Sequence, residues 1–422
     1  MVEVGPTTIT QDRLKAGGRT FTLAAGLGVA GLILTGIGYA VGGAADRPTI
    51  LAGYLVAFAY WLGIAIAASI WNAVFHASAA RWMTVFRRVF ESMGAAIPIF
   101  IVLFLPIALG MTELFPWVSP SNKMSHEQLE LLTHKALWLN VPGFLIRAAV
   151  YFLIWVVVNQ LLRGWSLRQD QEGGLEPTRR MRRYGSGALP FLGLSITFAG
   201  FDWLMSVDPF WYSTIFGAYY FTGSFLACIA LLTVITVRTR HEQRQFGGLV
   251  TRHHTHNLGK LMLAFTAFWT YIAFSQFMLI WIANIPEESS WYVVRMKGGW
   301  QSVGIFLVVT HFIVPFFTLL SRGLKFNPRG LAFIAVWILV VHWVDLTWLV
   351  FPAPRLLGAW RQSSPPVQPK PRGGSWLAKP NLRNTWTRSA SRCVAVVSSG
   401  RPRGPRVPRW VSSVGSKCTC RS

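Results

Sequence analysis

The chain has 422 residues, of which 52% are hydrophobic and 13% are charged, and its mean hydropathy is positive. This composition excludes an ordinary soluble domain and indicates a polytopic membrane protein. The net charge of +24 would suit a nucleic-acid-binding protein, but 14 Lys and Arg residues with no acid lie after position 354. The other 26 basic and 16 acidic residues give the rest of the chain a net charge of +10, and they lie mostly in loops between apolar runs. We therefore expect no nucleic-acid partner.

Nine apolar runs are each long enough to cross a bilayer core, which takes about 20 helical residues. None shows the two-residue alternation of barrel strands, so we expect helices. The fold class is therefore predicted to be an all-α polytopic membrane protein. The predicted spans are residues 21–43, 51–75, 94–112, 141–162, 187–206, 213–236, 259–284, 302–321 and 331–352.

The basic residues predict the orientation of the spans, because Lys and Arg concentrate in cytoplasmic loops. Up to position 354, alternate segments hold 20 basic residues on one side and five on the other. This places residues 1–20 in the cytoplasm and 21–354 in a transmembrane domain. The loop 113–140, with a short amphipathic helix around Ser125–Trp138, then faces the opposite side.

Residues 355–422 form a basic tail with no Asp, Glu, His, Ile, Phe, Tyr or Met. The bias towards Arg, Pro, Ser, Gly, Trp and Cys resembles a GC-rich reading frame translated out of register. A basic disordered arm is the alternative, and in neither case do we expect a packed core.

Metal chemistry has little support in this sequence. Cys228 lies in an apolar run and the other three cysteines lie in the tail, with no CxxC or CxxCH motif. His253, His254 and His256 form a histidine cluster, but in a basic segment without acids or cysteines we expect a solvated loop. We predict no metal site in this chain.

Asp202, in FAGFDWLMSVDPFW, lies within a predicted span. A carboxylate inside a membrane is a candidate for proton transfer or for a polar ligand contact. The alternative is a hydrogen bond to Trp, Tyr or Ser of a neighbouring helix. Asp208 precedes Pro209, and there we expect a helix cap.

His342 and Asp345 stand three residues apart, on one face of a predicted helix. Such a pair can pass a proton near neutral pH, although a satisfied buried histidine is the plainer interpretation. His311 is a weaker candidate on its own, as is Arg147. His76, at the cytoplasmic end of its span, could accept protons from that side or be structural.

The stretch 253–300 carries polar side chains, including Tyr271 and Gln276, inside an apolar helix, and leaves it through Glu287 and Glu288. Polar groups at membrane depth normally face other helices or a water-filled path. We therefore expect this helix to form one wall of a feature inside a bundle.

Two long segments carry a resemblance to a known family: FDWLMSVDPFWYSTIFGAYYFTGSF (201–225) and LGKLMLAFTAFWTYIAFSQFMLIWIANIPEESSWY (258–292). They resemble the NrfD/polysulfide-reductase membrane subunits, in particular those of bacterial Alternative Complex III, a quinol:cytochrome c oxidoreductase. The resemblance implies ten helices: two four-helix bundles, with the first and last helix outside them. This chain departs from the pattern after its ninth predicted helix.

The resemblance also implies location, partners and cofactors. The chain would lie in the bacterial inner membrane beside a sister NrfD-like subunit, a periplasmic iron–sulfur subunit and multihaem c-type cytochromes. Haem and iron–sulfur clusters would lie only in those partners, and quinone or quinol is the ligand that this chain could contact. On this sequence the proton path or quinone contacts would fall on five residues: Asp202, Gln276, His311, His342 and Asp345. Tyr271 joins Asp202 and Gln276 as a candidate quinone contact.

We therefore expect a membrane subunit of a quinol-oxidising respiratory or photosynthetic complex, which offers quinone-facing surface, proton conduction or both. One alternative is a structural anchor for periplasmic redox subunits. Another is a stand-alone proton-coupled transporter, for which paired broken helices would be expected.

Overall fold

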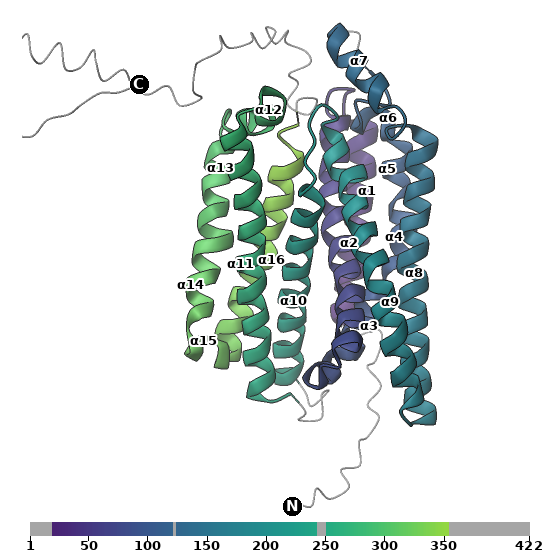
Figure 1. The fold of residues 1–422 in the computed structure, drawn as a ribbon, viewed down its shortest axis with the longest axis vertical. Coiled ribbons are helices and arrows are strands. Elements are labelled where there is room, and N and C mark those ends of the chain that lie inside the picture. Colours follow the sequence, from purple (N-terminus) through teal and green to yellow (C-terminus); the bar gives the residue numbers. More distant parts are fainter. Residues whose placement is uncertain (1–18, 121–123, 243–249, 354–422) are drawn as a thin grey trace, which may run out of the picture. The chain divides into compact units, whose positions relative to one another are not determined.

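The computed structural model describes residues 19–120, 124–242 and 250–353 (Figure 1). These residues are almost entirely helical and include no strand, which confirms the all-α class. The predicted tail, 355–422, and nearly all of the predicted N-terminal segment, 1–20, lie outside the described residues.

Nine helical stretches in the described ranges are long and apolar enough to cross a membrane, as the sequence predicted. The spans are Thr22–Val41, Arg47–Ser78, Arg81–Leu109, Val141–Glu172, Glu176–Val207, Phe216–Thr239, Arg252–Ala283, Trp300–Leu320 and Pro328–Val350.

Four spans form a first bundle, with α2 largely buried among the others. These are α2 (Arg47–Ser78), the broken span α3 (Arg87–Gly94), α4 (Ile97–Leu103) and α5 (Leu105–Leu109), then α8 (Val141–Glu172) and α9 (Glu176–Ala199). Outside this bundle lies α1 (Arg19–Val41), whose described side chains are mostly exposed and which packs on α2.

The next four spans form a second bundle around α10. These are α10 (Phe216–Glu242), α11 (Arg252–Ala283), the composite span α13 (Trp300–Leu307), η4 (Val308–Ile313) and α14 (Val314–Leu320), and α16 (Pro328–Val350). The bundles meet where α10 packs on α2 and α9. At Gly217 a Cβ would lie 2.4 Å from the Thr197 side chain, so only glycine permits this close crossing.

The short elements are η1 (Arg81–Phe86), α6 (Met111–Leu114), α7 (His126–Lys135), the π-helix η2 (Gly200–Leu204), η3 (Met205–Val207), α12 (Pro286–Arg295) and α15 (Arg322–Phe326). They either begin or end a span, as η1, η2 and η3 do, or lie between spans. The predicted amphipathic helix is α7, where Ser125 Oγ accepts a hydrogen bond from the Gln128 amide at 3.2 Å.

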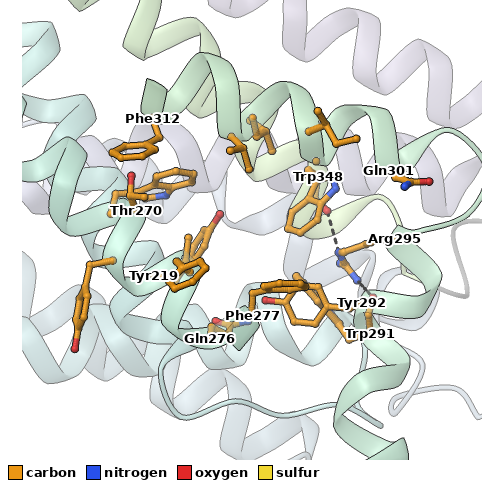
Figure 2. A pocket seen from close by; sticks show the side chains of 18 of the residues that line it. Tyr219, Thr270, Gln276, Phe277, Trp291, Tyr292, Arg295, Gln301, Phe312 and Trp348 are labelled. Atoms are coloured by element: carbon orange, nitrogen blue, oxygen red, sulfur yellow. Dashed lines mark hydrogen bonds between the residues drawn. The ribbon is translucent and has the colours of Figure 1, made fainter. Parts of the chain in front are cut away.

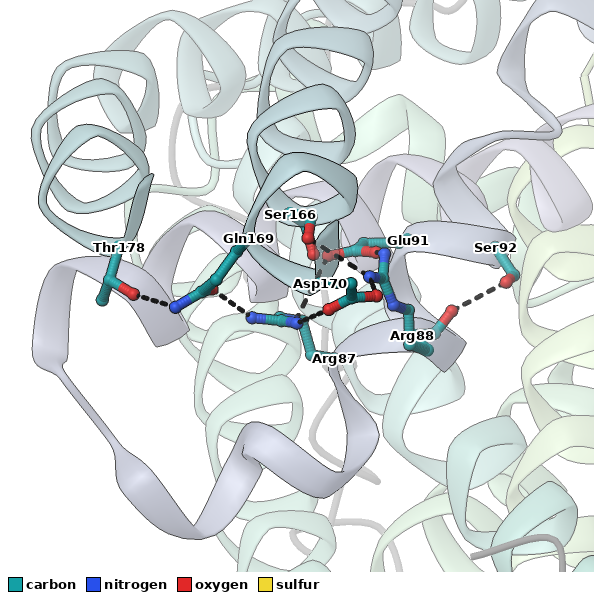
Figure 3. Close-up of polar contacts among 8 residues, drawn as sticks. All are labelled: Arg87, Arg88, Glu91, Ser92, Ser166, Gln169, Asp170 and Thr178. Atoms are coloured by element: carbon teal, nitrogen blue, oxygen red, sulfur yellow. Dashed lines mark hydrogen bonds and ion pairs between the residues drawn. The ribbon is translucent and has the colours of Figure 1, made fainter. Parts of the chain in front are cut away.

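Two helices run further than the sequence predicted, because polar contacts support their ends. The segment between the fourth and fifth spans is largely helical: α8 continues to Glu172 and α9 begins at Glu176. Figure 3 shows the network that holds this end to α3. Arg87 donates to Gln169 at 2.9 Å and to Asp170 at 3.2 Å, while Arg88 pairs with both Asp170 and Glu91.

The histidine cluster was predicted in a loop, and that prediction is wrong. His253, His254 and His256 lie in the first turns of α11, which begins at Arg252. Thr251 and His254 form a capping box, in which the Thr251 amide donates to His254 Nδ1 at 3.1 Å.

The prediction that Asp208 caps the start of a helix is also wrong, since Asp208 is instead the C-cap residue of η3. This residue lies between η3 and α10, and α10 begins only at Phe216. Burial raises the pKa of Asp208, while Arg295 and Lys135 act in the opposite direction.

Candidate functional site

A cavity of about 700 Å³ lies within the second bundle, between α11, α12, α13 and α16 (Figure 2). Nearly half of the residues in its walls are aromatic, including Trp269, Phe277, Trp291, Phe312 and Trp348. A cavity of this size and character suits a small organic ligand.

The cavity opens sideways, towards the lipid-facing surface of the bundle. Tyr271 and Phe274 on α11 and Ile305 on α13 line it, and they are 64%, 57% and 59% exposed. All three lie in membrane spans. A ligand could therefore enter from the hydrocarbon phase without crossing water.

Few polar side chains interrupt the aromatic lining. Gln276 is 3% exposed, and its Oε1 has no hydrogen-bond partner among the described residues. An unpartnered buried acceptor in a cavity wall is a group that a ligand can satisfy.

Tyr219 connects the cavity to buried titratable residues. Its ring lines the cavity, and its hydroxyl donates to Asp345 Oδ1 at 2.6 Å. The other carboxylate oxygen, Oδ2, lies 3.7 Å from His342 Nδ1, which is longer than a hydrogen bond. Both nitrogens of His342 and Oδ2 of Asp345 lack partners in the described part of the chain.

His311 extends this cluster. Its ring centroid lies 3.9 Å from that of Trp269 and 6.2 Å from that of His342. Both of its nitrogens are buried, again without a partner among the described residues. Tyr219, Asp345, His342 and His311 thus form one contiguous buried group, which we call the relay cluster.

His311 lies in the π-helix η4, and Pro315 accounts for this geometry. Val314 donates to Val309, a π-type bond, and the next such bond, from Pro315 to Thr310, is impossible because proline has no N–H. The Thr310 carbonyl instead accepts from Trp337 Nε1 at 2.8 Å. Single π-turns often mark functional sites in membrane and soluble helices.

Gly223 on α10 makes room for the His342 ring. A Cβ at this position would lie 2.6 Å from Cε1 and 3.1 Å from Nδ1 of His342. Any side chain would therefore displace the imidazole.

Arg295 on α12 is a buried cation in the cavity wall (Figure 2). It donates to the carbonyls of Trp348, Leu349 and Trp291 at 3.2, 2.6 and 3.0 Å, and stacks 3.2 Å from the Trp291 ring centroid. Burial lowers its pKa to about 9, opposed by Asp208, so it remains charged at neutral pH. No carboxylate among the described residues forms a salt bridge with it.

Asp202 has a different environment, in the first bundle. It accepts from Arg147 at 2.8 and 2.9 Å, from Tyr151 at 2.8 Å and from Trp138 Nε1 at 2.9 Å. A fully paired carboxylate of this kind is typical of a structural ion pair. It lies outside the cavity lining.

The structure therefore separates the residues that the sequence singled out. Gln276 and Tyr271 line the cavity, and His311, His342 and Asp345 adjoin it, whereas Asp202 and His76 do not. Tyr219 and Arg295 were not predicted as site residues. Their signals were weak: one tyrosine within an aromatic run, and one arginine in a segment that the sequence placed outside the membrane.

No protein-family model matches this sequence, and a comparison with curated proteins finds no similar one.

Proposed function

We propose that this chain is a membrane subunit of a quinol-oxidising electron-transfer complex, and that it contributes the lateral cavity as a quinol site with its own proton acceptor. The observation that carries the proposal is the contact between a lipid-facing aromatic cavity and a buried carboxylate through Tyr219. The resemblance of residues 201–225 and 258–292 to NrfD-like subunits supports the same reading.

The shape and polarity of the cavity fit a quinone ring. Such a ring is flat, apolar and dissolved in the bilayer, and it carries two oxygens that need polar partners. Aromatic walls can stack on the ring, and Gln276, Tyr219 and Arg295 offer separate polar contacts. The side opening leaves a path for an apolar tail along Phe274 and Ile305.

The relay cluster can take up a proton that quinol oxidation releases. Two-electron oxidation of a hydroquinone to a quinone releases two protons, and the two electrons would go to iron–sulfur or haem centres of partner subunits. As Tyr219 accepts a proton from a bound hydroxyl, it can give its own proton to Asp345 Oδ1. His342, 3.7 Å from Asp345, is the next acceptor.

This role predicts a clear difference between two neighbouring tyrosines. Tyr219→Phe removes the hydroxyl that reaches Asp345, so quinol oxidation should fall by roughly 100- to 10,000-fold, the usual effect of losing general acid–base catalysis. Tyr220→Phe is the matched control. The Tyr220 hydroxyl donates to the Ala59 carbonyl and lies outside the cavity, so activity should be retained.

The test uses tagged chain purified from its native membrane with whatever partners accompany it. The measurements are c-haem absorbance, which reports assembly, and quinol:cytochrome c activity. If both tyrosine variants assemble and retain activity, this chain is a structural anchor rather than a quinol site. If the chain purifies alone and transports ions, the transporter alternative holds.

A further inference from the structure

The cavity offers opposite hydrogen-bonding character at two places. The Tyr219 hydroxyl proton is committed to Asp345, so towards the cavity its oxygen can only accept. The Arg295 guanidinium can only donate. Figure 2 shows these two residues at different parts of the cavity, with Gln276 and Phe277 between them.

Arg295 also brings a net charge that the described residues do not pair. Its three backbone acceptors carry partial charges only. Asp208 is the acid that acts on it electrostatically, and Tyr219 and Tyr292 are the other titratable groups that do so. Lys135 is near Asp208, and Asp345 lies behind Tyr219. Glu287 and Glu288 lie in the first turn of α12, and Lys297 follows its end.

A buried cation of this kind favours an anion beside it. In a water-poor cavity the attraction is weakly screened, and an arginine near a carboxyl commonly lowers the carboxyl pKa by about one to three units. The same field acts on any acidic hydroxyl held there.

We infer that the cavity preferentially binds the singly ionised form of a ring with two oxygen substituents, with the oxyanion facing Arg295 and a donor facing Tyr219. This inference rests on the proposed quinol site. A neutral quinone supplies two acceptors and leaves the Tyr219 oxygen without a donor. The monoanion of a dihydroxy ring supplies one donor and one charged acceptor, which matches both ends.

Two naphthoquinones isolate the preference for charge at Arg295, because neither offers an O–H to Tyr219 once the hydroxy compound has ionised. The ring hydroxyl of 2-hydroxy-1,4-naphthoquinone ionises under acidic conditions to a coloured anion, and 1,4-naphthoquinone has no such hydroxyl. Trp269, Trp291 and Trp348 line the cavity, so quenching of tryptophan fluorescence reports binding of either probe to the purified chain in its complex. Visible absorbance reports the ionisation of the bound hydroxy compound.

At neutral pH the hydroxy probe should bind about tenfold more tightly than 1,4-naphthoquinone. The preference should fall below the pH at which the free hydroxyl is protonated, because the charge that faces Arg295 is then lost. Arg295→Met should abolish the preference and raise the ionisation pH of the bound probe by about one unit or more, whereas Arg295→Lys should retain both properties.

The outcomes distinguish a failure of the anion preference from a failure of the proposed quinol site. Equal binding of both probes at neutral pH, or a preference that does not fall in acid, overturns the inference and leaves the quinol site standing. No binding of either probe removes the quinol site as well. Arg295→Met removes the donors to the carbonyls of α16 and could therefore fail to fold. In that case the acid titration of the wild type and the Arg295→Lys variant still test the preference for the anion.

Discussion

Asp202 and Asp345 show how two buried carboxylates in one chain can have different roles. Asp202 has four hydrogen bonds and a paired arginine, whereas Asp345 has one tyrosine donor and an oxygen with no partner among the described residues. A satisfied carboxylate contributes to folding, and an unsatisfied one is available for chemistry. The sequence could identify both as intramembrane acids, but not their partners, because Arg147 and Tyr219 are distant in sequence.

Asp202→Asn should destabilise the protein without affecting the cavity. The substitution leaves Arg147, 18% exposed, without its counter-charge, and breaking a buried pair in this way typically costs about 3–5 kcal/mol. Thermal unfolding of the purified protein measures the loss, and the naphthoquinone quenching assay should be unchanged below the unfolding transition. Weaker probe binding with unaltered stability would make Asp202 a site residue after all.

Gly223→Ala should disturb the relay cluster through a single methyl group. The new Cβ would lie 2.6 Å from His342 Cε1, so the imidazole must move away from its place beside Asp345. We expect lower quinol oxidation in an assembled complex. Gly193→Ala is the control, since nothing lies within 4 Å of its added Cβ and alanine favours helix by roughly 1 kcal/mol. Equal activity of the two variants would show that the position of His342 does not matter.

At the scale of elements, the helices were predictable and their irregularities were not. Nine apolar runs identified nine spans, but the π-turn at η4 depends on a bond that Pro315 cannot make and on Trp337 from another helix. The long end of α8 likewise depends on Arg87 and Arg88 from α3, and Gln169 on α8 in turn donates to Thr178 on α9. Local hydrophobicity carries no information about either contact.

Pro315→Ala should make the protein more stable and less active. Restoring an N–H allows η4 to return to regular helix, and proline in a helix interior costs about 3 kcal/mol relative to alanine. That rearrangement would rotate His311 away from Trp269, which it now contacts at 3.9 Å between ring centroids. A higher unfolding temperature with reduced quinol oxidation is the expected pair of results. If activity rises with stability, the π-turn has no role in the site.

The arginine network in Figure 3 should depend more on its buried acid than on its exposed one. The side chains of Glu91 and Asp170 are 2% and 51% exposed. Asp170→Asn should cost about 0–1 kcal/mol, as is usual for exposed pairs. Glu91→Gln should cost more, because Arg87 and Arg88 then face each other with less buried counter-charge. Thermal unfolding of both variants shows which substitution lowers the stability more. A larger loss of stability in Asp170→Asn than in Glu91→Gln would contradict this prediction.

At the scale of the whole molecule, the distribution of basic residues predicts which end faces the cytoplasm. The end formed by α3 and the junction of α8 and α9 carries the arginines, and α7 lies at the other end (Figure 1). In a variant whose three tail cysteines are replaced by serine, Glu130→Cys on α7 should react with a membrane-impermeant thiol reagent in spheroplasts. Glu172→Cys, on α8, should react only after lysis. The reverse pattern would invert the predicted topology.

The architecture of the whole molecule was predicted partly from the apolar runs and partly from the family resemblance. Apolar runs gave the class and the number of spans, whereas the division into two bundles with α1 outside came from the family resemblance and agrees with the packing. The polar side chains of segment 253–300 predicted one wall of a feature inside a bundle, but the cavity itself needs Tyr219, Gln276, Arg295 and Trp348 to converge from four helices. Such convergence is a property of packing rather than of any one segment.

Photoaffinity labelling of native membranes with an azido-quinone, followed by peptide mapping of this chain, tests the proposed quinol site directly. We expect label on α11 and on α13, near Phe274 and Ile305, which line the side opening. Excess unlabelled quinol should suppress that label. Labelling confined to the first bundle, or label that quinol does not displace, would contradict a quinol site in this cavity.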